Sequence, residues 1–341
     1  MDTLIKFAVI PMIKIAVIVG ILSGGIAYLT LLERKVIARM QHRLGPMRVG
    51  WHGLLQPIAD GLKFIIKEDV IPLRADKLLF TIAPAISLIP AFVVFAVIPF
   101  GPPESLWGTG GYVTDVNIAL LFVLAVSSVG VLGIILGGWA SNSKYPLLGA
   151  LRSSAQMVSY EVAMGFGIIG VLLLANTLSL VEVVQRQKQM GVWFFFVQPV
   201  SFLIYYICGM AETNRLPFDL PEAESELVGG FHTEYSGFRF SLFFIAEYAN
   251  MITVSSLAVT LFFGGWLRPF PNVEALAFLD LIPAPLWFTV KVFIFLYIFI
   301  WIRGTLPRFR FDQLMNIGWK LLLPVAIANV MVTGAVLLRF I

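Results

Sequence analysis

The chain has 341 residues, of which 59% are hydrophobic and only 13% are charged. Soluble domains carry roughly 25% charged residues, so this composition excludes a water-soluble protein and predicts an integral membrane protein. The formal net charge of +4 could indicate nucleic-acid binding. The basic residues, however, cluster between apolar runs, which is typical of membrane topology, and we expect no nucleic-acid partner.

Few side chains are available for redox chemistry. The single cysteine, Cys208, excludes an internal disulfide and a cysteine-ligated zinc or iron–sulfur site. His42, His52 and His232 all lie outside the long apolar runs, so we do not expect a membrane-embedded haem held by two histidines. We predict no metal site and no catalytic redox group in this chain, and any redox centres would belong to partners.

In chain order, the sequence shows eight apolar runs that approach the length of about 20 residues needed to cross a membrane. The fifth run is short and begins near Pro199. The sequence therefore predicts an all-α integral membrane protein whose single polytopic domain covers residues 1–341. The predicted spans are 9–32, 78–99, 116–139, 154–175, 195–211, 239–265, 286–303 and 318–338.

Lysine and arginine concentrate in the odd-numbered connectors, above all in 33–77. By the positive-inside rule these connectors face the cytoplasm, and both termini face the outer side of the membrane. Connector 33–77 also contains apolar residues at helical spacing, which predicts an amphipathic helix lying in the membrane interface. Pro57 would kink this helix or delay its start. Its apolar residues are Trp51, Leu54, Leu55, Ile58, Leu62, Ile65 and Ile66.

The connector 212–238, expected on the same cytoplasmic side, is rich in acids. A solvated acidic loop is the simplest interpretation, but here the acids alternate with apolar residues. Clustered carboxylates in a dehydrated site raise one another's pKa values and can exchange protons near neutral pH. We therefore expect a proton-handling role for this connector. Its acids are Glu212, Asp219, Glu222, Glu224, Glu226 and Glu234.

Three further charges lie within or near apolar runs: Glu161, Glu247 and Lys291. A carboxylate at mid-bilayer costs roughly 2.5–3.5 kcal/mol on insertion scales, so such residues usually face a protein interior or a wet cavity. Either acid could instead be a structural hydrogen-bonding group between helices. Lys291 could pair with an acid or extend toward the membrane surface.

Six stretches of the sequence, in order, resemble the quinone-site membrane component of respiratory complex I, the proton-pumping NADH:quinone oxidoreductase, known in bacteria as its H subunit. They cover nearly the whole chain. One departure is Phe311, where members of this family often have tyrosine. The stretches are 33–46, 56–69, 138–161, the acidic connector, 243–251 and 301–324.

The resemblance implies a bacterial inner-membrane subunit without a cofactor of its own, joined to a hydrophilic arm that carries FMN and iron–sulfur clusters. Arg34, Asp60 and Phe231 would border a tunnel for a lipid quinone, next to the partner with the terminal iron–sulfur cluster. The acids of the connector, together with Glu161 and Glu247, would couple quinone reduction to proton pumping. Small and antiporter-like membrane subunits would complete the assembly.

Three alternatives remain from the sequence. A related hydrogenase or ferredoxin-linked complex could use the same acids without a quinone tunnel. A stand-alone ion transporter could use them as its ion site, although the chain shows no inverted repeat of the kind common in transporters. An interaction-only scaffold would leave the buried acids unexplained.

Overall fold

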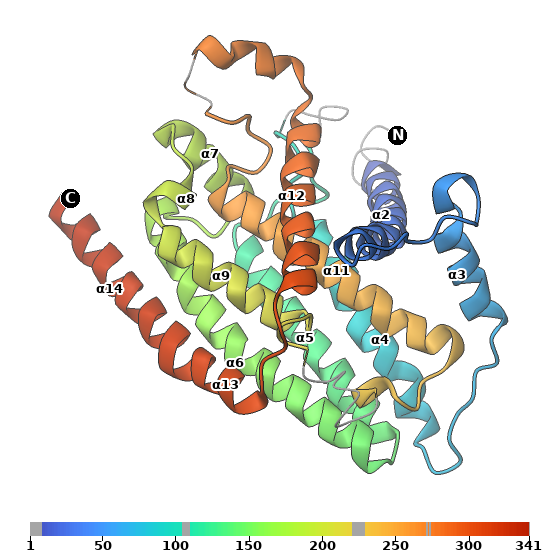
Figure 1. Cartoon of the computed structure of the whole chain (residues 1–341). Coiled ribbons are helices and arrows are strands. Elements are labelled where there is room, and N and C mark those ends of the chain that lie inside the picture. Colours follow the sequence, from blue (N-terminus) through green and yellow to red (C-terminus); the bar gives the residue numbers. More distant parts are fainter. Residues whose placement is uncertain (1–8, 104–109, 220–228, 271, 273, 341) are drawn as a thin grey trace.

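The computed structural model describes residues 9–103, 110–219, 229–270, 272 and 274–340 (Figure 1). In these ranges the chain is helical and contains no strand, which confirms the all-α prediction. The helices are α2 Ile10–Met40, η2 Trp51–Gly53, α3 Gln56–Ile66, α4 Lys77–Val93, η3 Val94–Ala96, α5 Ala119–Ala140, α6 Lys144–Ala175, α7 Leu180–Met190, α8 Phe194–Val197, α9 Pro199–Glu212, η4 Gly230–His232, α11 Gly237–Phe262, η5 Glu274–Leu281, α12 Ala284–Thr305, α13 Phe311–Asn316, η6 Ile317–Leu322 and α14 Leu323–Phe340.

Seven helices in the described ranges are long and apolar enough to cross a membrane. The predicted fifth span corresponds to α9, an apolar helix of only 14 residues. At 1.5 Å per residue it measures about 21 Å, against about 30 Å for the hydrocarbon core of a bilayer. The seven long helices and this short one agree with the eight predicted spans. We conclude that the protein is a multi-pass membrane protein.

Two helices extend well beyond the predicted membrane-crossing segments. The first helix continues to Met40, beyond the predicted end at residue 32, and α6 begins at Lys144 rather than at 154. Hydropathy marks the part of a helix that lies in lipid, whereas helix formation continues through residues such as Glu, Arg, Lys and Ala until a breaker. As a result, Glu33 and Arg34 lie on a continuous helix and not in a connector.

The amphipathic helix predicted in connector 33–77 is α3. It begins at Gln56 with Pro57 in its first turn. Of the two predicted effects of Pro57, a kink or a delayed start, the structure shows the delayed start. Ile58, Leu62 and Ile65 remain more than half exposed, and Figure 1 shows α3 at the edge of the bundle. This apolar face is therefore not covered by the described part of the chain.

Small residues allow α4 and α5 to pack closely. A Cβ atom at Gly133 of α5 would lie 2.2 Å from Oγ of Ser87 and 2.7 Å from its backbone nitrogen. Glycine at such a position lets two helix backbones approach within a membrane, where packing rather than the hydrophobic effect holds helices together. Ser87 itself donates a hydrogen bond to the carbonyl of Gly130 at 3.4 Å.

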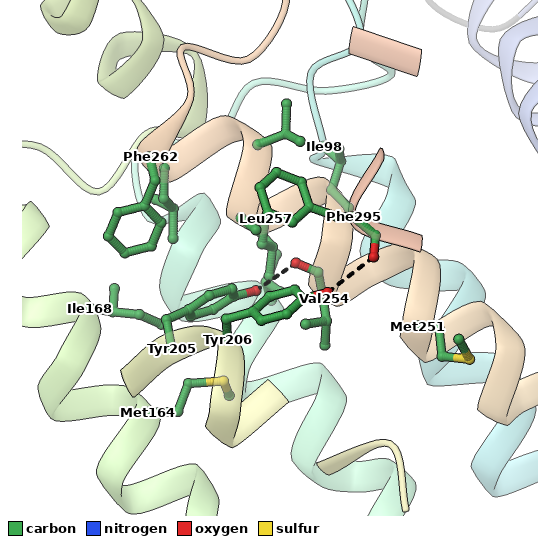
Figure 2. Packing of buried hydrophobic residues seen from close by; sticks show 14 of the residues in the cluster. Ile98, Met164, Ile168, Tyr205, Tyr206, Met251, Val254, Leu257, Phe262 and Phe295 are labelled. Atoms are coloured by element: carbon green, nitrogen blue, oxygen red, sulfur yellow. Dashed lines mark hydrogen bonds between the residues drawn. The ribbon is translucent and has the colours of Figure 1, made fainter. Parts of the chain in front are cut away.

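Two tyrosines of α9 tie the centre of the bundle together (Figure 2). The hydroxyl of Tyr205 donates to the carbonyl of Val254 on α11 at 2.9 Å, and that of Tyr206 donates to Phe295 on α12 at 3.0 Å. A buried tyrosine hydroxyl requires such a partner. The short helix α9 is thereby fixed against two long ones, and its last residue, Glu212, is held at a defined place.

Candidate functional site

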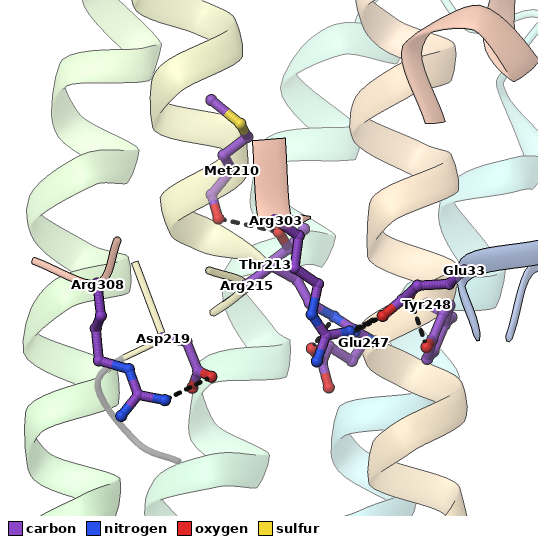
Figure 3. A network of polar contacts seen from close by, with 9 residues as sticks. All are labelled: Glu33, Met210, Thr213, Arg215, Asp219, Glu247, Tyr248, Arg303 and Arg308. Atoms are coloured by element: carbon purple, nitrogen blue, oxygen red, sulfur yellow. Dashed lines mark hydrogen bonds and ion pairs between the residues drawn. The ribbon is translucent and has the colours of Figure 1, made fainter. Parts of the chain in front are cut away.

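A buried cluster of charged residues joins α2, α11, α12 and the connector after α9. We call Glu33, Arg215, Glu247, Tyr248 and Arg303 the arginine–glutamate cluster (Figure 3). Nη1 of Arg215 lies 3.2 Å from Oε1 of Glu33, and the hydroxyl of Tyr248 donates to Oε2 of Glu33 at 2.9 Å. Arg303 also pairs with Glu33, and Nε of Arg215 pairs with Glu247.

The charged groups of this cluster are buried, so they need these contacts to offset the loss of water. The side chains of Glu33 and Arg215 are only 5% and 6% exposed. Removing ions from water costs several kcal/mol each unless they are paired and hydrogen-bonded. Two arginines oppose two glutamates here, so the ionised cluster is formally neutral. The aromatic rings of Tyr248 and Phe244 lie 4.2 and 5.6 Å from the Arg215 guanidinium carbon, which adds cation–π attraction.

A second ion pair holds the start of the acidic connector. Nη2 of Arg308 lies 3.4 Å from Oδ2 of Asp219 (Figure 3). Gln156 of α6 donates from its amide nitrogen to the carbonyls of Ala211 and Phe218, both at 2.8 Å. These bonds satisfy backbone groups where the chain leaves α9, because irregular backbone at membrane depth needs partners from the protein.

Beside the cluster lies a small cavity, which we call the acid cavity. Its volume is about 50 Å³, and Glu212, Phe231, His232 and Glu247 are among its lining residues. A cavity needs about 10–15 Å³ and several polar partners to hold a water molecule, so this one has room for water between the two carboxylates. Glu161 of α6 lies close enough to Glu212 for an electrostatic interaction.

One residue that lines this cavity, His232, is an uncharged histidine. Burial lowers the pKa of His232 from 6.5 to about 4, because burial disfavours the charged form of the imidazole. The neighbouring Tyr235 is also buried, and burial raises the pKa of its hydroxyl. At neutral pH both side chains are therefore neutral.

The predicted tunnel residues fall into two places. Arg34 on α2 and Asp60 on α3 form an ion pair, with Nη1 and Oδ2 2.7 Å apart. Gln56 also donates to Asp60, at 3.1 Å. Phe231, by contrast, lies in the acid cavity, where its ring is 5.3 Å from that of Phe243.

The predicted acids also separate. Glu161, Glu212 and Glu247 gather at or near the acid cavity, Asp219 is held by Arg308, and Glu234 is partly buried in the segment before α11. Glu222, Glu224 and Glu226 lie outside the described residues.

Among the described residues, Lys291 contacts backbone carbonyls and not an acid. Its ammonium group donates to the backbone carbonyls of Phe263, Gly265 and Leu267 at 2.7, 3.0 and 2.6 Å. These carbonyls follow the end of α11, where a cation is favourable.

Sequence reasoning missed Glu33, Arg215, Tyr248 and Arg303. Glu33 stands at the end of an apolar run next to Arg34, and Arg215 and Arg303 were counted only as topology signals. Within the described ranges, no three His, Cys, Asp or Glu side chains gather in a way that could hold a metal ion.

Comparison with known proteins relates the chain to subunits of an enzyme complex. A family model described as NADH dehydrogenase matches residues 13–334. A protein of Geobacter sulfurreducens, named as H subunit 1 of an NADH-quinone oxidoreductase, is 52% identical over 95% of this chain and 93% of its own length. A protein of Rhizobium meliloti, named as H subunit 2 of such an enzyme, is 51% identical over 98% of this chain and 99% of its own length.

Proposed function

Because this chain belongs to the NADH dehydrogenase family and is a membrane subunit of an NADH–quinone oxidoreductase, we propose that it borders the quinone passage and couples quinone reduction to proton translocation. The proposal places the end of α2, helix α3 and the acid cavity at the cytoplasmic side, with both termini outside. FMN and iron–sulfur clusters would lie in partner subunits of the hydrophilic arm, and small and antiporter-like membrane subunits would receive the coupling signal. The hydrophilic-arm subunits would carry out the redox chemistry, and this chain would supply the charged groups and part of the wall of the quinone passage.

The observation that carries the proposal is a continuous series of ionisable groups across four helices. It runs from Glu161 on α6 to Glu212 on α9, through the acid cavity to Glu247 on α11, and through Arg215 to Glu33 on α2. Neighbouring members share an ion pair, an electrostatic interaction or the wall of one cavity. Even at an effective dielectric constant of 20, unit charges 4 Å apart interact by about 4 kcal/mol, which is sufficient to shift a protonation equilibrium.

The quinone passage would lie between α2 and α3, beside the Arg34–Asp60 pair. Arg34 directly follows Glu33 in the sequence. A change of charge near the Arg34–Asp60 pair would therefore also change the electrostatic potential at Glu33 and the buried cluster. Reduction of a quinone to a quinol consumes protons. A site that supplies them would therefore alter the balance between Arg215 and its two glutamates.

Arg215 is the group through which such a change would pass. It pairs with both Glu33 and Glu247, so protonation of Glu247 would weaken one contact and strengthen the guanidinium's attraction to Glu33. The charge state of the acid cavity would thus be linked to that of α2 without any new contact. The acids Glu222, Glu224 and Glu226, together with Glu234, would extend this series toward the cytoplasm.

The relatives' names support a quinone-reducing enzyme over the hydrogenase and stand-alone transporter alternatives. The test is to replace Glu212 and Glu247 separately with glutamine in the tagged chain, and to purify the intact complex. The expected result is slower NADH-driven quinone reduction, or unchanged reduction with less proton translocation per NADH in vesicles.

Glu182, an exposed acid on α7, provides the matched control, since Glu182→Gln should alter neither rate nor proton yield. Wild-type rates and proton yields in both the Glu212 and Glu247 variants would refute the coupling role.

A further inference from the structure

A second cavity, far larger than the acid cavity, lies between α2, α11 and α12. Its volume is about 610 Å³, and its walls include Ile21, Leu29, Phe288, Val292 and Leu296. Figure 1 shows these three helices as neighbours on one side of the bundle. The size falls within the range of about 300–1,000 Å³ that is typical of ligand sites.

A space of this kind requires an apolar occupant. Protein interiors pack as densely as organic crystals, with few voids larger than a water molecule. Apolar cavities do not hold water well, because water there lacks hydrogen-bond partners. All three wall helices are membrane spans, so the cavity is surrounded by the acyl chains of lipids, which can fill it.

One buried hydroxyl in the wall is left without a hydrogen bond to any described residue. Ser256 of α11 is 1% exposed and lines this cavity, and its Oγ makes no hydrogen bond with the described part of the chain. Leaving a buried hydroxyl without a partner costs free energy, and an oxygen atom of the occupant would remove that cost.

Most of the polar groups of the cavity lie toward one membrane face. Lys14, near the start of α2, donates to the carbonyls of Gly110 and Tyr112 at 2.9 and 3.0 Å, and all three residues line the cavity. Ser256 lies near the end of α11 and Thr289 near the start of α12, which puts both toward the face where α2 begins. The wall toward the opposite end is mainly apolar, with Leu29, Leu32 and Leu296, and Tyr28 adds one hydroxyl there.

We propose that this cavity binds one acyl chain of a phospholipid, with its ester carbonyl accepting a hydrogen bond from Ser256. The glycerol end of the lipid would lie at the face where α2 begins, and the chain would extend toward Leu29 and Leu296. This arrangement matches the polarity of the cavity and the orientation of a lipid in that leaflet. The bound chain would support α2, the helix that carries Glu33 and Arg34.

Two adjacent glycines of α2 provide a matched test. A Cβ atom at either Gly24 or Gly25 would meet no atom within 4 Å, but only Gly25 lines the cavity. Gly25→Leu would fill the space, whereas Gly24→Leu adds the same side chain elsewhere. The intact complex is placed in phosphatidylethanolamine–phosphatidylglycerol vesicles that contain phosphatidylethanolamine with a diazirine in its acyl chain, and the labelled peptides are mapped by mass spectrometry.

The expected result is labelling of both α2 and α12 in the wild type and Gly24→Leu, and its loss in Gly25→Leu. Ser256→Ala should lower the labelling of both helices, which tests the ester contact without adding bulk. Equal labelling in the wild type and Gly25→Leu would overturn the proposal. A diazirine-tailed quinone that labels the same peptides and displaces the phospholipid would also overturn it, as would cross-linking of these peptides to a partner subunit without lipid.

If Gly25→Leu does not assemble, the wild type and Ser256→Ala decide the question. Absence of wild-type label from either α2 or α12, or equal labelling of the wild type and Ser256→Ala, would then reject the site.

Discussion

Glu33 and Arg215 are separated by 182 positions in the sequence, yet their side chains meet at 3.2 Å in the interior of the bundle. Glu33 belongs to the first membrane helix, and Arg215 follows the short helix α9. Their pairing makes the position of α2 depend on the connector that begins the acidic region. A buried pair of this kind adds little net stability, but loss of one partner leaves an uncompensated charge.

Arg215→Met should therefore prevent stable assembly of the complex, since removing one partner of a buried pair costs about 3–5 kcal/mol. The measurement is the amount of intact complex in detergent-extracted membranes. Arg34→Met is the control, because the side chains of Arg34 and Asp60 are 51% and 21% exposed and assembly should be less sensitive to the loss of that pair. The double variant Arg215→Met/Glu247→Gln restores formal neutrality and should recover part of the assembly. No recovery would argue against a charge-balancing role.

The Arg34–Asp60 pair should matter for quinone use and not for stability. The Arg34 side chain is 51% exposed, and exposed ion pairs contribute only about 0–1 kcal/mol. Asp60→Asn should leave assembly unchanged and raise the KM for quinone. Asp69→Asn, which breaks the partly exposed Asp69–Arg239 pair, should change neither. Identical quinone kinetics in wild type and Asp60→Asn would remove this pair from the passage.

His232 should make the protein less stable in mild acid. The unfolded chain binds a proton at His232 below about 6.5, whereas the folded chain does so only near 4. The unfolded state thus binds more protons between these values, and stability falls as pH decreases from 6.5 toward 4. The Tm of the complex should decrease between pH 7 and pH 5, and His232→Asn should reduce that decrease. A decrease of the same size in the variant would contradict the assignment.

Two glycines of α5 should differ sharply in their tolerance of alanine. A Cβ at Gly133 would lie 2.2 Å from Ser87 Oγ, whereas one at Gly130 would meet no atom within 4 Å. Overpacking a tight contact typically costs about 1–3 kcal/mol. Gly133→Ala should lower the Tm and the yield of the complex, and Gly130→Ala should change neither. A similar Tm and a similar yield for the two variants would mean that α4 and α5 can move apart without loss of stability.

Hydropathy predicted the spans well because a backbone in lipid must satisfy its own hydrogen bonds, and only long apolar helices do so. The same pattern indicated that Glu161 and Glu247 were unusual. It could not reveal their partners, since the pairing of Arg215 with Glu33 depends on how distant helices pack. Charges at the ends of apolar runs, such as Glu33 and Arg303, resemble ordinary membrane anchors until the structure shows that they are paired inside. The helix ends at Met40 and Lys144 escaped prediction because lipid depth and helix length are separate properties.

The brevity of α9 has a mechanical consequence. Its length of about 21 Å falls short of the roughly 30 Å hydrocarbon core, so the chain at its ends must complete the crossing. Each end is fastened by a glutamine: Gln198 donates to Thr333 Oγ1 at 2.7 Å, and Gln156 holds the carbonyls of Ala211 and Phe218. A full-length helix would be held in place by its contact with both membrane faces. The short helix α9 is instead held by side-chain hydrogen bonds at its two ends and, through Tyr205 and Tyr206, along its length, so its position in the membrane is set by protein contacts and not by its own hydrophobic length.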